Sequence, residues 1–340
     1  MTQTEQKKCV AYVGSSHHIK KTKSTIFLIE LLQEHYHVEL LITDNWQQGE
    51  IPSDVHLDDR YHAVIFFQSM PQGVWKLPSK KNFIFAPMYD QSGEDPIENW
   101  IEYRDFKILC FSKVLGKKLS TLGFRTFSAL YYPEPKPFPQ PPESGTLFFW
   151  QRRVELDWPL VRKLIPPGYL KKVHLHLAMD LGEPVYPSEN EKKTVQFTYS
   201  TWFENKDQVD VLIQNHELYV APRLTEGIGF SFLEAMAQGA IVIAANNPTM
   251  NEYILHEQTG FLYNPKRPQP LDLTKISEIQ QRLPEALKKG YQEWQLSRGA
   301  LIQFIDEPLR PLGKAWVFTL VVAKIRLFLR ALKRKVRSLF

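Results

Sequence analysis

Two glutamates, Glu226 and Glu234, stand eight positions apart within residues 225–254. The first opens a short turn that contains two glycines, and the second lies in residues 232–237, a run of good helix formers. Glycines let an anionic group approach the backbone closely, and the N–H groups at the start of a helix attract phosphate. A carboxylate repels phosphate but accepts hydrogen bonds from sugar hydroxyls. Two carboxylates that flank one anion-binding turn therefore indicate a nucleotide-sugar site.

Apolar runs on either side predict the elements that hold this turn. Residues 218–222 form an apolar run before it, and Gly239 with the apolar residues 240–245 follows the helix. This pattern predicts a strand, a glycine turn, a helix, a glycine cap and a second strand. In a parallel sheet, such a unit places the helix N-terminus at the carboxyl edge, which suits a diphosphate.

The whole segment resembles the Glu-x7-Glu signature of retaining nucleotide-sugar glycosyltransferases of family 4 (glycosyl transferases group 1), which have the GT-B fold. The resemblance extends through residues 195–222 and 246–265 and covers roughly the C-terminal half of the chain. It implies an α/β protein with two Rossmann-like domains that face an interdomain cleft. It also implies a hexosyltransferase that uses a nucleotide-diphosphate sugar as donor. The alternative is a Rossmann-like domain that binds another nucleotide.

The resemblance also assigns roles to side chains. Glu226 would contact hydroxyls of the donor sugar near the reacting carbon, and Glu234 would hold the ribose hydroxyls. The family keeps the anomeric configuration of the donor sugar. This is explained by attack of the acceptor within a tight ion pair on the face that the phosphate leaves, and the leaving phosphate takes the acceptor proton. Such a reaction works by positioning and charge stabilisation, so we expect no cofactor and no metal. Backbone N–H groups would face the sugar and the diphosphate from Gly227, Ile228, Gly229 and Phe230.

Cations for the diphosphate are expected after the first strand of the second domain. Arg152, a candidate catalytic group like Glu226, aligns with an arginine of the family, which usually carries Gly-Arg and, a few residues later, a lysine. Here Gln151 replaces the glycine, and Asp157 stands about where the lysine belongs. Arg153 or Lys163 could take over the role of the lysine in donor binding. The alternative is that both are solvated surface charges.

The N-terminal half carries a weaker signal. Related enzymes often show a Gly-Gly turn near the start and a His-Asp pair after a middle strand. This chain has Gly14, Ser15 and His17 at the first place and Asp90 at the second. Because loops at the carboxyl ends of strands meet acceptor or donor groups, all four are candidate site residues, and Asp90 is a candidate catalytic group.

Composition fits a globular protein with two domains. A chain of 340 residues is long for one core, and Cys9 and Cys110 lie in separate apolar runs, which predicts free buried thiols. The first eight residues lack the apolar core of a secretion signal, and no apolar stretch approaches the roughly 20 residues that span a membrane. His174 and His176 share one strand face, but no third metal ligand is evident, so we expect packing.

Alternating strands and helices predict a parallel sheet in each half. Expected strands cover residues 9–13, 38–43, 63–67, 82–86, 107–111, 146–150, 172–177, 194–199, 218–222 and 240–245. Expected helices include residues 24–34, 113–122 and 283–305. Six prolines in residues 131–145 predict a stiff linker. We thus expect an acceptor-side domain, a linker, a nucleotide-sugar domain and a tail, with these respective bounds: 1–132, 133–145, 146–308 and 309–340.

The tail is strongly basic, with eight Lys or Arg and no acid in residues 314–340. Since the formal net charge is +5, the rest of the chain carries −3 (5 − 8), which argues against a nucleic-acid partner. Apolar residues at helical spacing predict a basic amphipathic helix suited to anionic lipid. The alternative is that its first part packs on the first domain. The residues expected at the membrane are Arg326, Arg330, Lys333, Arg337, Phe328 and Leu332.

Together these features predict a bacterial, peripheral glycosyltransferase on the cytoplasmic face of the inner membrane. It would transfer a sugar to a glycan acceptor that is lipid-linked, in the synthesis of lipopolysaccharide, capsule or another cell-surface polysaccharide. Two alternatives stay open: a GT-B sugar-nucleotide epimerase, and a non-catalytic scaffold subunit that binds the nucleotide sugar.

Overall fold

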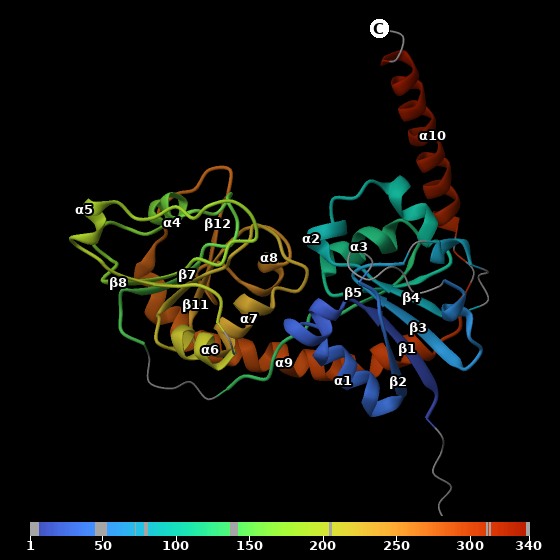
Figure 1. Cartoon of the computed structure of the whole chain (residues 1–340), viewed down its shortest axis with the longest axis horizontal. Helices are drawn as coiled ribbons and strands as arrows, with labels where there is room; N and C mark the ends of the chain where they lie inside the picture. Colours follow the sequence, from blue (N-terminus) through green and yellow to red (C-terminus); the bar gives the residue numbers. More distant parts are fainter. Residues whose placement is uncertain are drawn as a thin grey trace, which may run out of the picture. The chain divides into compact units, whose positions relative to one another are not determined.

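The computed structural model describes residues 7–44, 53–71, 73–77, 81–136, 142–203, 206–310, 312 and 314–337. The chain divides into two compact units. Unit 1 comprises Met1–Ala129 and Gln295–Phe340, and unit 2 comprises Leu130–Trp294. Among the described residues, each unit contains one parallel sheet of six strands (Figure 1).

Unit 1 has the strand order β2-β1-β3-β4-β5-β6. Its strands are β1 (Cys9–Gly14), β2 (His37–Ile42), β3 (Tyr61–Phe67), β4 (Phe83–Ala86), β5 (Lys107–Cys110) and β6 (Arg125–Ser128). Its helices and turns up to β6 are η1 (His17–Lys21), α1 (Ile26–His35), η2 (Ser53–Leu57), η3 (Val74–Lys76), α2 (Tyr89–Ser92), η4 (Ile97–Tyr103) and α3 (Lys113–Thr121). The strand order reverses between β1 and β3, so the carboxyl end of β1 lies at a topological switch point.

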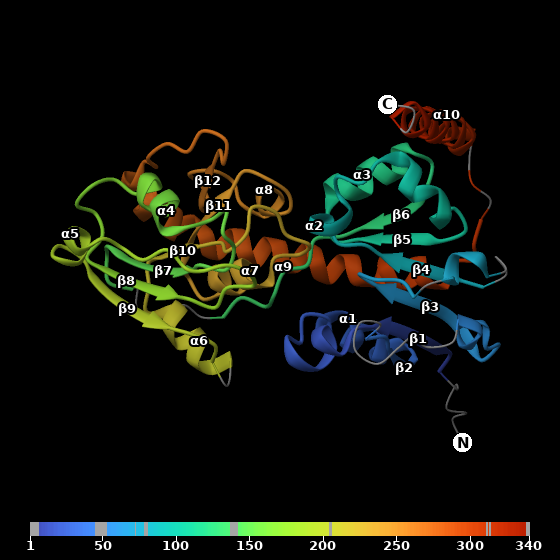
Figure 2. The same cartoon turned by 45° about the horizontal axis from the view of Figure 1, so that its top comes forward.

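Unit 2 repeats this design with the order β12-β11-β10-β7-β8-β9, and Figure 2 shows β7, β8 and β9 side by side. Its strands are β7 (Thr146–Trp150), β8 (Lys172–His176), β9 (Gln196–Ser200), β10 (Leu218–Val220), β11 (Ile241–Ala245) and β12 (Phe261–Tyr263). Its short helices are α4 (Trp158–Leu164), α5 (Glu189–Lys192), α6 (Lys206–Gln214), α7 (Phe230–Ala237), α8 (Met250–Tyr253) and η5 (Leu273–Lys275). The order reverses between β7 and β10, which are neighbours at the centre of the sheet.

All ten predicted strands are present, each displaced by at most two residues at either end. They were recognisable because strands covered on both faces of a parallel sheet are continuous apolar runs. The structure adds β6 and β12, which no pattern predicted. Both are edge strands: β6 is only partly buried and mixes polar with apolar residues, and β12 has only three residues.

The domain boundaries differ from the predicted ones. The long helix α9 (Ile276–Asp306) contributes its residues up to Trp294 to unit 2 and those from Gln295 onward to unit 1. Unit 2 also begins at Leu130, before the predicted linker. Within that linker, residues 137–141 lie outside the described part of the chain.

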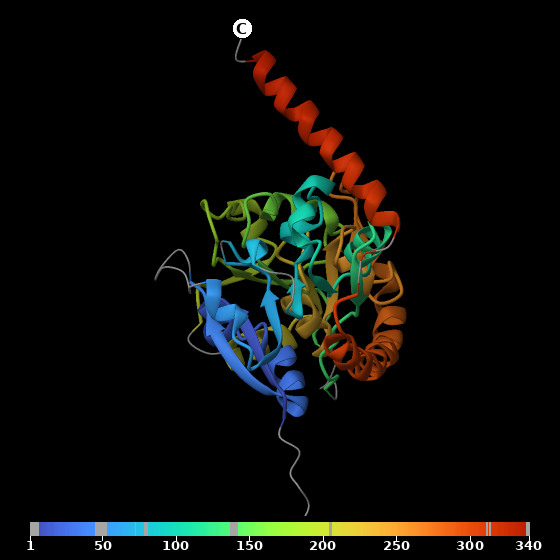
Figure 3. The same ribbon diagram turned by 90° about the vertical axis from the view of Figure 1, so that its right-hand side faces the viewer.

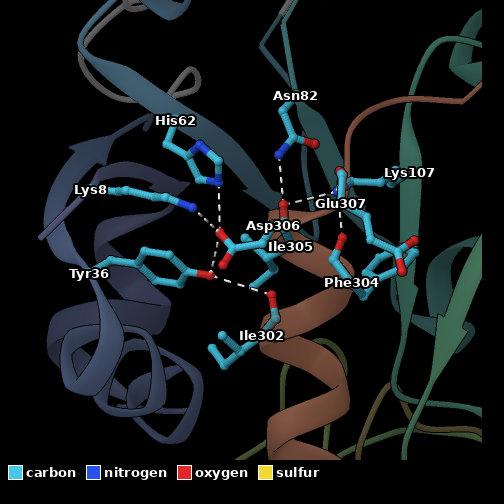
Figure 4. A network of polar contacts seen from close by, with 10 residues as sticks. All are labelled: Lys8, Tyr36, His62, Asn82, Lys107, Ile302, Phe304, Ile305, Asp306 and Glu307. Carbon is cyan, nitrogen blue, oxygen red and sulfur yellow. Dashed lines mark hydrogen bonds and ion pairs between the residues drawn. The ribbon is translucent and has the colours of Figure 1, made fainter.

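The end of α9 belongs to unit 1 because unit 1 completes its hydrogen bonds (Figure 4). The last carbonyl groups of a helix have no partner within it. The buried ammonium group of Lys107 on β5 donates to the main-chain oxygens of Ile305 at 3.0 Å and Glu307 at 2.7 Å, and also to that of Phe304. Burial lowers the pKa of Lys107 to about 8. The carboxylate of Asp306 accepts hydrogen bonds from the Tyr36 hydroxyl at 3.2 Å and the Lys8 ammonium at 3.1 Å.

The tail forms α10 (Lys314–Arg337), whose first turns pack on unit 1. The ring of Trp316 lies edge-on to that of Phe124 at 5.0 Å, and the Thr319 hydroxyl donates to Leu122 O at 2.8 Å. Gly123 has a φ of +90°, and a Cβ there would lie 2.6 Å from Trp316 N, so the close approach requires glycine. None of the helices in the described part of the chain is long and apolar enough to cross a membrane.

Candidate active site

The carboxyl ends of β7 and β10 meet at the switch point of the unit 2 sheet. The two strands pair in parallel, with Phe149 opposite Val220. Arg152 follows β7 by two residues, and the glycine turn that begins at Glu226 follows β10. Because parallel strands end at the same edge, groups more than seventy positions apart in the sequence are brought together there.

The buried Tyr219 of β10 reports on the charges around this edge. Burial raises the pKa of Tyr219, the charges of Glu226 and Glu234 raise it further, and that of Arg152 lowers it. The charges of these three residues, which the sequence predicts to bind the donor, thus all act on the Tyr219 hydroxyl.

Glu226 is buried in a turn that is held from two sides. Its carboxylate lies 3.5 Å from Nη1 of Arg223, and its N–H donates to Pro248 O at 3.3 Å. The buried hydroxyl of Thr249 lies 3.5 Å from Glu226 O and 3.4 Å from Ile228 O. These contacts join the turn to the segment after β11 and fix the position of the Glu226 carboxylate.

Gly229 sets the direction of α7. Its φ is +87°, and a Cβ there would lie 1.9 Å from the ring of Phe232, so glycine is required on both grounds. The helix begins at Phe230, and the first N–H groups of a helix lack partners within it. The turn therefore faces a helix N-terminus, where an anion binds favourably. Glu234 is half-buried on the second turn of the same helix.

Arg152 and Arg153 share one carboxylate partner that the sequence did not point to. Nε of Arg152 lies 3.0 and 3.1 Å from the two oxygens of Asp180, and Nε of Arg153 lies 3.1 Å from one of them. The Arg152 guanidinium also stacks over the Trp150 ring, 4.8 Å from its centre. Asp180 lies in the loop after β8, and its N–H donates to Arg152 O at 2.9 Å. Two cations are thus oriented together at the edge of the sheet.

The two residues predicted to replace the missing lysine lie in different elements. Arg153 lies beside Arg152, whereas Lys163 is exposed in the last turn of α4. A helix rises about 1.5 Å per residue, so Lys163, five residues after Trp158, lies about 7.5 Å along the axis from the start of α4.

Asp157 and Gln151, the two departures from the family pattern, have structural roles. Asp157 caps α4, and its carboxylate accepts a hydrogen bond from Leu160 N at 2.9 Å. Gln151 is fully buried, and its amide is placed to pair with both main-chain groups of Val185, donating to the carbonyl oxygen at 3.0 Å. Gln151 therefore holds the loop that also carries Asp180.

His174 and His176 are packed among hydroxyl groups and aromatic rings. The two ring nitrogens of His174 lie 2.8 Å from the Thr198 hydroxyl and 2.7 Å from the Ser200 hydroxyl, and Nδ1 of His176 lies 2.9 Å from Ser200. Burial lowers the pKa of both imidazoles to about 4. This arrangement agrees with the expected packing role.

The candidate residues of the N-terminal half lie at the carboxyl edge of the unit 1 sheet. Gly14 ends β1 at the switch point, and the Ser15 hydroxyl accepts a hydrogen bond from the N–H of the exposed His17 at 3.1 Å. The carboxylate of Asp44, a residue that the sequence did not point to, accepts a hydrogen bond from the main-chain N–H of Ser16 at 2.9 Å. Asp90 is half-buried in the first turn of α2, after β4.

A separate group of side chains could be considered for a metal. Candidate ligand atoms of Cys9, His37 and Glu39 lie within 4.8 Å of one another. Burial and the nearby Glu39 raise the pKa of Cys9, which disfavours the thiolate form that binds metals. Both cysteines are free, as predicted, but only Cys110 is fully buried.

Residues 188–289 match the sequence model of the family described as Glycosyl transferases group 1. The match covers 102 of the 340 residues. The matched segment contains Glu226, Glu234 and the turn between them, so the prediction of a glycosyltransferase is confirmed at the level of this class. No curated protein sequence matches the chain significantly.

Solved structures of glycosyltransferases share the fold. HepE from Anabaena in complex with UDP and glucose is 13% identical over 87% of this chain and 99% of its own, with a TM-score of 0.58. Sucrose-phosphate synthase from Thermosynechococcus elongatus is 12% identical over 88% of this chain and 98% of its own, with a TM-score of 0.56. The lipopolysaccharide outer core galactosyltransferase WaaB in its apo form is 12% identical over 94% of this chain and 99% of its own, with a TM-score of 0.52. The predicted GT-B class with two parallel α/β domains and a C-terminal helix is confirmed.

Proposed function

We propose that this chain is a retaining glycosyltransferase of family 4 that transfers a hexose from a nucleoside-diphosphate sugar to a glycan acceptor. The observation that carries the proposal is that β7 and β10 end together at the switch point of unit 2, where Arg152 follows one strand and the turn from Glu226 into α7, which holds Glu234, follows the other. A relative of the same fold is in complex with UDP and glucose, which makes UDP-sugars the first donors to test.

Each group has chemistry suited to one part of such a donor. Arg152 and Arg153, with the first N–H groups of α7, would stabilise the charge that develops on the leaving diphosphate. Glu226 would accept hydrogen bonds from the sugar, and Glu234 from the ribose. The leaving phosphate would take the acceptor proton, so the reaction needs neither a protein nucleophile nor a metal ion.

The proposed acceptor is a lipid-linked glycan in bacterial cell-surface polysaccharide synthesis, and the proposed place is the cytoplasmic face of the inner membrane. Support comes from the basic helix α10 and from the shared fold of an outer core galactosyltransferase. On unit 1, the loop from Gly14 to His17 and Asp90 are the candidate groups for the acceptor.

A binding screen tests the donor site. The melting temperature of the full chain would be measured with UDP-, GDP-, ADP-, CMP- and dTDP-sugars, because a ligand that binds only the folded state stabilises it. Sugars of one nucleotide should stabilise the wild type and the exposed-helix control Glu285→Ala, but not Glu234→Ala. If no nucleotide sugar stabilises the folded wild type, the proposed function fails.

Product analysis separates the transferase from its alternatives. A transferase should form a new glycosidic bond with the donor's anomeric configuration retained, and Glu226→Ala should abolish it. An epimerase would change the nucleotide sugar without any acceptor, and a scaffold subunit would bind the nucleotide sugar and leave it intact.

A further inference from the structure

Two arginines of α10 that the sequence predicts at the membrane contact a buried carboxylate elsewhere in unit 1. Nη2 of Arg330 lies 2.8 Å from Oε1 of Glu98, and Nη1 of Arg326 lies 3.9 Å from Oε2. Glu98 belongs to η4, and its side chain is only 2% exposed. A buried carboxylate is costly unless a charge compensates it. Arg326 and Arg330 therefore attach α10 to η4 within unit 1, a contact that the sequence did not predict.

This attachment determines which face of α10 points outward. Trp316, Thr319 and Ala323 are buried against unit 1 on the same side as the two arginines. Helical spacing turns the opposite side to solvent, where Phe318 is 74% and Phe328 is 68% exposed. α10 extends beyond the rest of unit 1 (Figure 3). The outward side, here called the apolar stripe, consists of Phe318, Val321, Ile325, Phe328 and Leu332.

Cations flank the apolar stripe. Lys324 and Lys333 are exposed on its two sides, about a quarter turn from its centre. The side chain of Arg337 lies outside the described residues. Since residues 314–340 contain no acid, the surface offers apolar groups bordered by positive charge alone, which is complementary to an anionic lipid interface.

A second copy of α10 is a poorer partner for the same stripe. The residues of the apolar stripe are spaced by three and four positions, which would suit a coiled coil. In a coiled coil, acidic and basic side chains beside the seam pair across the helices. Here such pairs are impossible because every charged residue of the helix is basic. The exposed Val317 and Leu329 also widen the stripe beyond a two-helix seam.

We propose that α10 docks on an anionic bilayer through the apolar stripe, with Lys324 and Lys333 at the level of the headgroups. Arg326 and Arg330 do not bind lipid but clasp Glu98, which keeps the stripe outward. The biological setting of this docking rests on the proposed membrane-located transferase, whereas its test does not.

Sedimentation of the full chain with vesicles tests the stripe. Vesicles of equal parts phosphatidylglycerol and phosphatidylcholine should bind the wild type, and phosphatidylcholine alone should bind it far less. The double variant Phe318→Ser/Phe328→Ser should partition about 10- to 100-fold more weakly, since each buried phenyl group contributes strongly. Leu296→Ser, which alters a side chain 82% exposed on α9, is the matched control and should bind like the wild type. No wild-type binding, or equal binding by the double variant, overturns the proposal.

A comparison of cations tests the clasp. Lys333→Gln should weaken vesicle binding about fivefold, because one basic residue near the surface contributes about that factor. Arg330→Gln should leave vesicle binding nearly unchanged but lower the melting temperature, and Glu98→Gln combined with it should lower that temperature little further. If Arg330→Gln weakens vesicle binding more than Lys333→Gln does and leaves the melting temperature unchanged, the role given to the arginines is overturned.

Two further measurements distinguish a failure of the membrane-docking proposal from a failure of the transferase proposal. Nucleotide-sugar stabilisation is measured without vesicles, and the stripe variant should keep it. If that stabilisation is absent while vesicle binding persists, the transferase proposal fails alone. If light scattering finds a wild-type dimer that the stripe variant abolishes, a second copy covers the stripe and the docking proposal is overturned.

Discussion

Nε of Arg152 lies 3.0 Å from Oδ1 of Asp180, and the same carboxylate holds Nε of Arg153. One acid from the loop after β8 therefore orients two cations from the loop after β7. Arginine binds phosphate best when its planar donors are held in place, so Asp180 is expected to prepare both side chains for a diphosphate.

Removal of this carboxylate should weaken donor binding. Asp180→Asn is expected to raise the dissociation constant for the nucleotide sugar about tenfold, and Arg152→Gln about 100-fold, because charged hydrogen bonds contribute about 1.5–3 kcal/mol. Titration calorimetry measures both, with the exposed Asp272→Asn as control. Tighter binding by Asp180→Asn would mean that Asp180 competes with the diphosphate instead of orienting the arginines.

The two glutamates should affect different kinetic constants. Glu226→Gln is expected to lower kcat about 100-fold, since Glu226 would act near the reacting carbon. Glu234→Gln is expected to raise the KM for the donor about tenfold with a smaller effect on kcat, since ribose contacts are alike in the ground and transition states. Initial rates with Glu285→Gln as control test this, and equal losses in kcat for both variants would contradict it.

Asp157 should contribute to stability and not to catalysis. Asp157→Ala removes the cap of α4 and should lower the free energy of unfolding by about 1 kcal/mol. Denaturant unfolding measures this loss, and kcat/KM should stay within about twofold. Asp157→Lys, which introduces the residue type usual in the family, should lose the same cap. A gain in donor affinity by Asp157→Lys without a loss of stability would refute the capping role.

The histidine pair should make unit 2 sensitive to acid. The pKa of both His174 and His176 is about 4 in the folded protein, below the ordinary value of 6.5. Between these values the unfolded chain binds more protons, so the free energy of unfolding is complete above pH 6.5 and declines toward pH 4. Each histidine accounts for up to about 3 kcal/mol. Urea unfolding at several pH values should show a shallower decline for His174→Gln than for the wild type or the exposed control His256→Gln. Parallel curves would contradict this.

Metal removal should leave turnover unchanged. The proposed reaction stabilises the diphosphate with arginine and helix N–H groups, so dialysis against EDTA should not lower the initial rate. A rate that falls with EDTA and returns with added magnesium would show that a cation shares this task.

The centre of the site was predictable because it is local in sequence. Glu226, its glycine turn and Glu234 lie in one short segment, and Arg152 follows a strand that its apolar residues reveal. Asp180 and Arg223 were not predicted, because their roles depend on loops from different strands meeting at one edge. The assignment of Lys163 relied on residue type alone, and its place on α4 could only be known from the structure.

The same contrast holds for the fold. Buried strands were recognisable by continuous apolar runs, whereas the edge strand β6 mixes polar with apolar residues and the edge strand β12 has only three residues. The assignment of the end of α9 to unit 1 depends on Lys107, a lone lysine whose partners are main-chain oxygens about 200 positions away. No local pattern encodes such a contact.

This contact bears on the order in which the chain folds during synthesis. Unit 2 is contiguous and can complete its core once Trp294 has left the ribosome, but unit 1 needs its second segment. Until Phe304 emerges, the Lys107 ammonium has none of its three carbonyl partners, and the set is complete only with Glu307. The half that is translated first should therefore be the half that finishes last, and a fragment ending at Ala129 should fail to reach the native state.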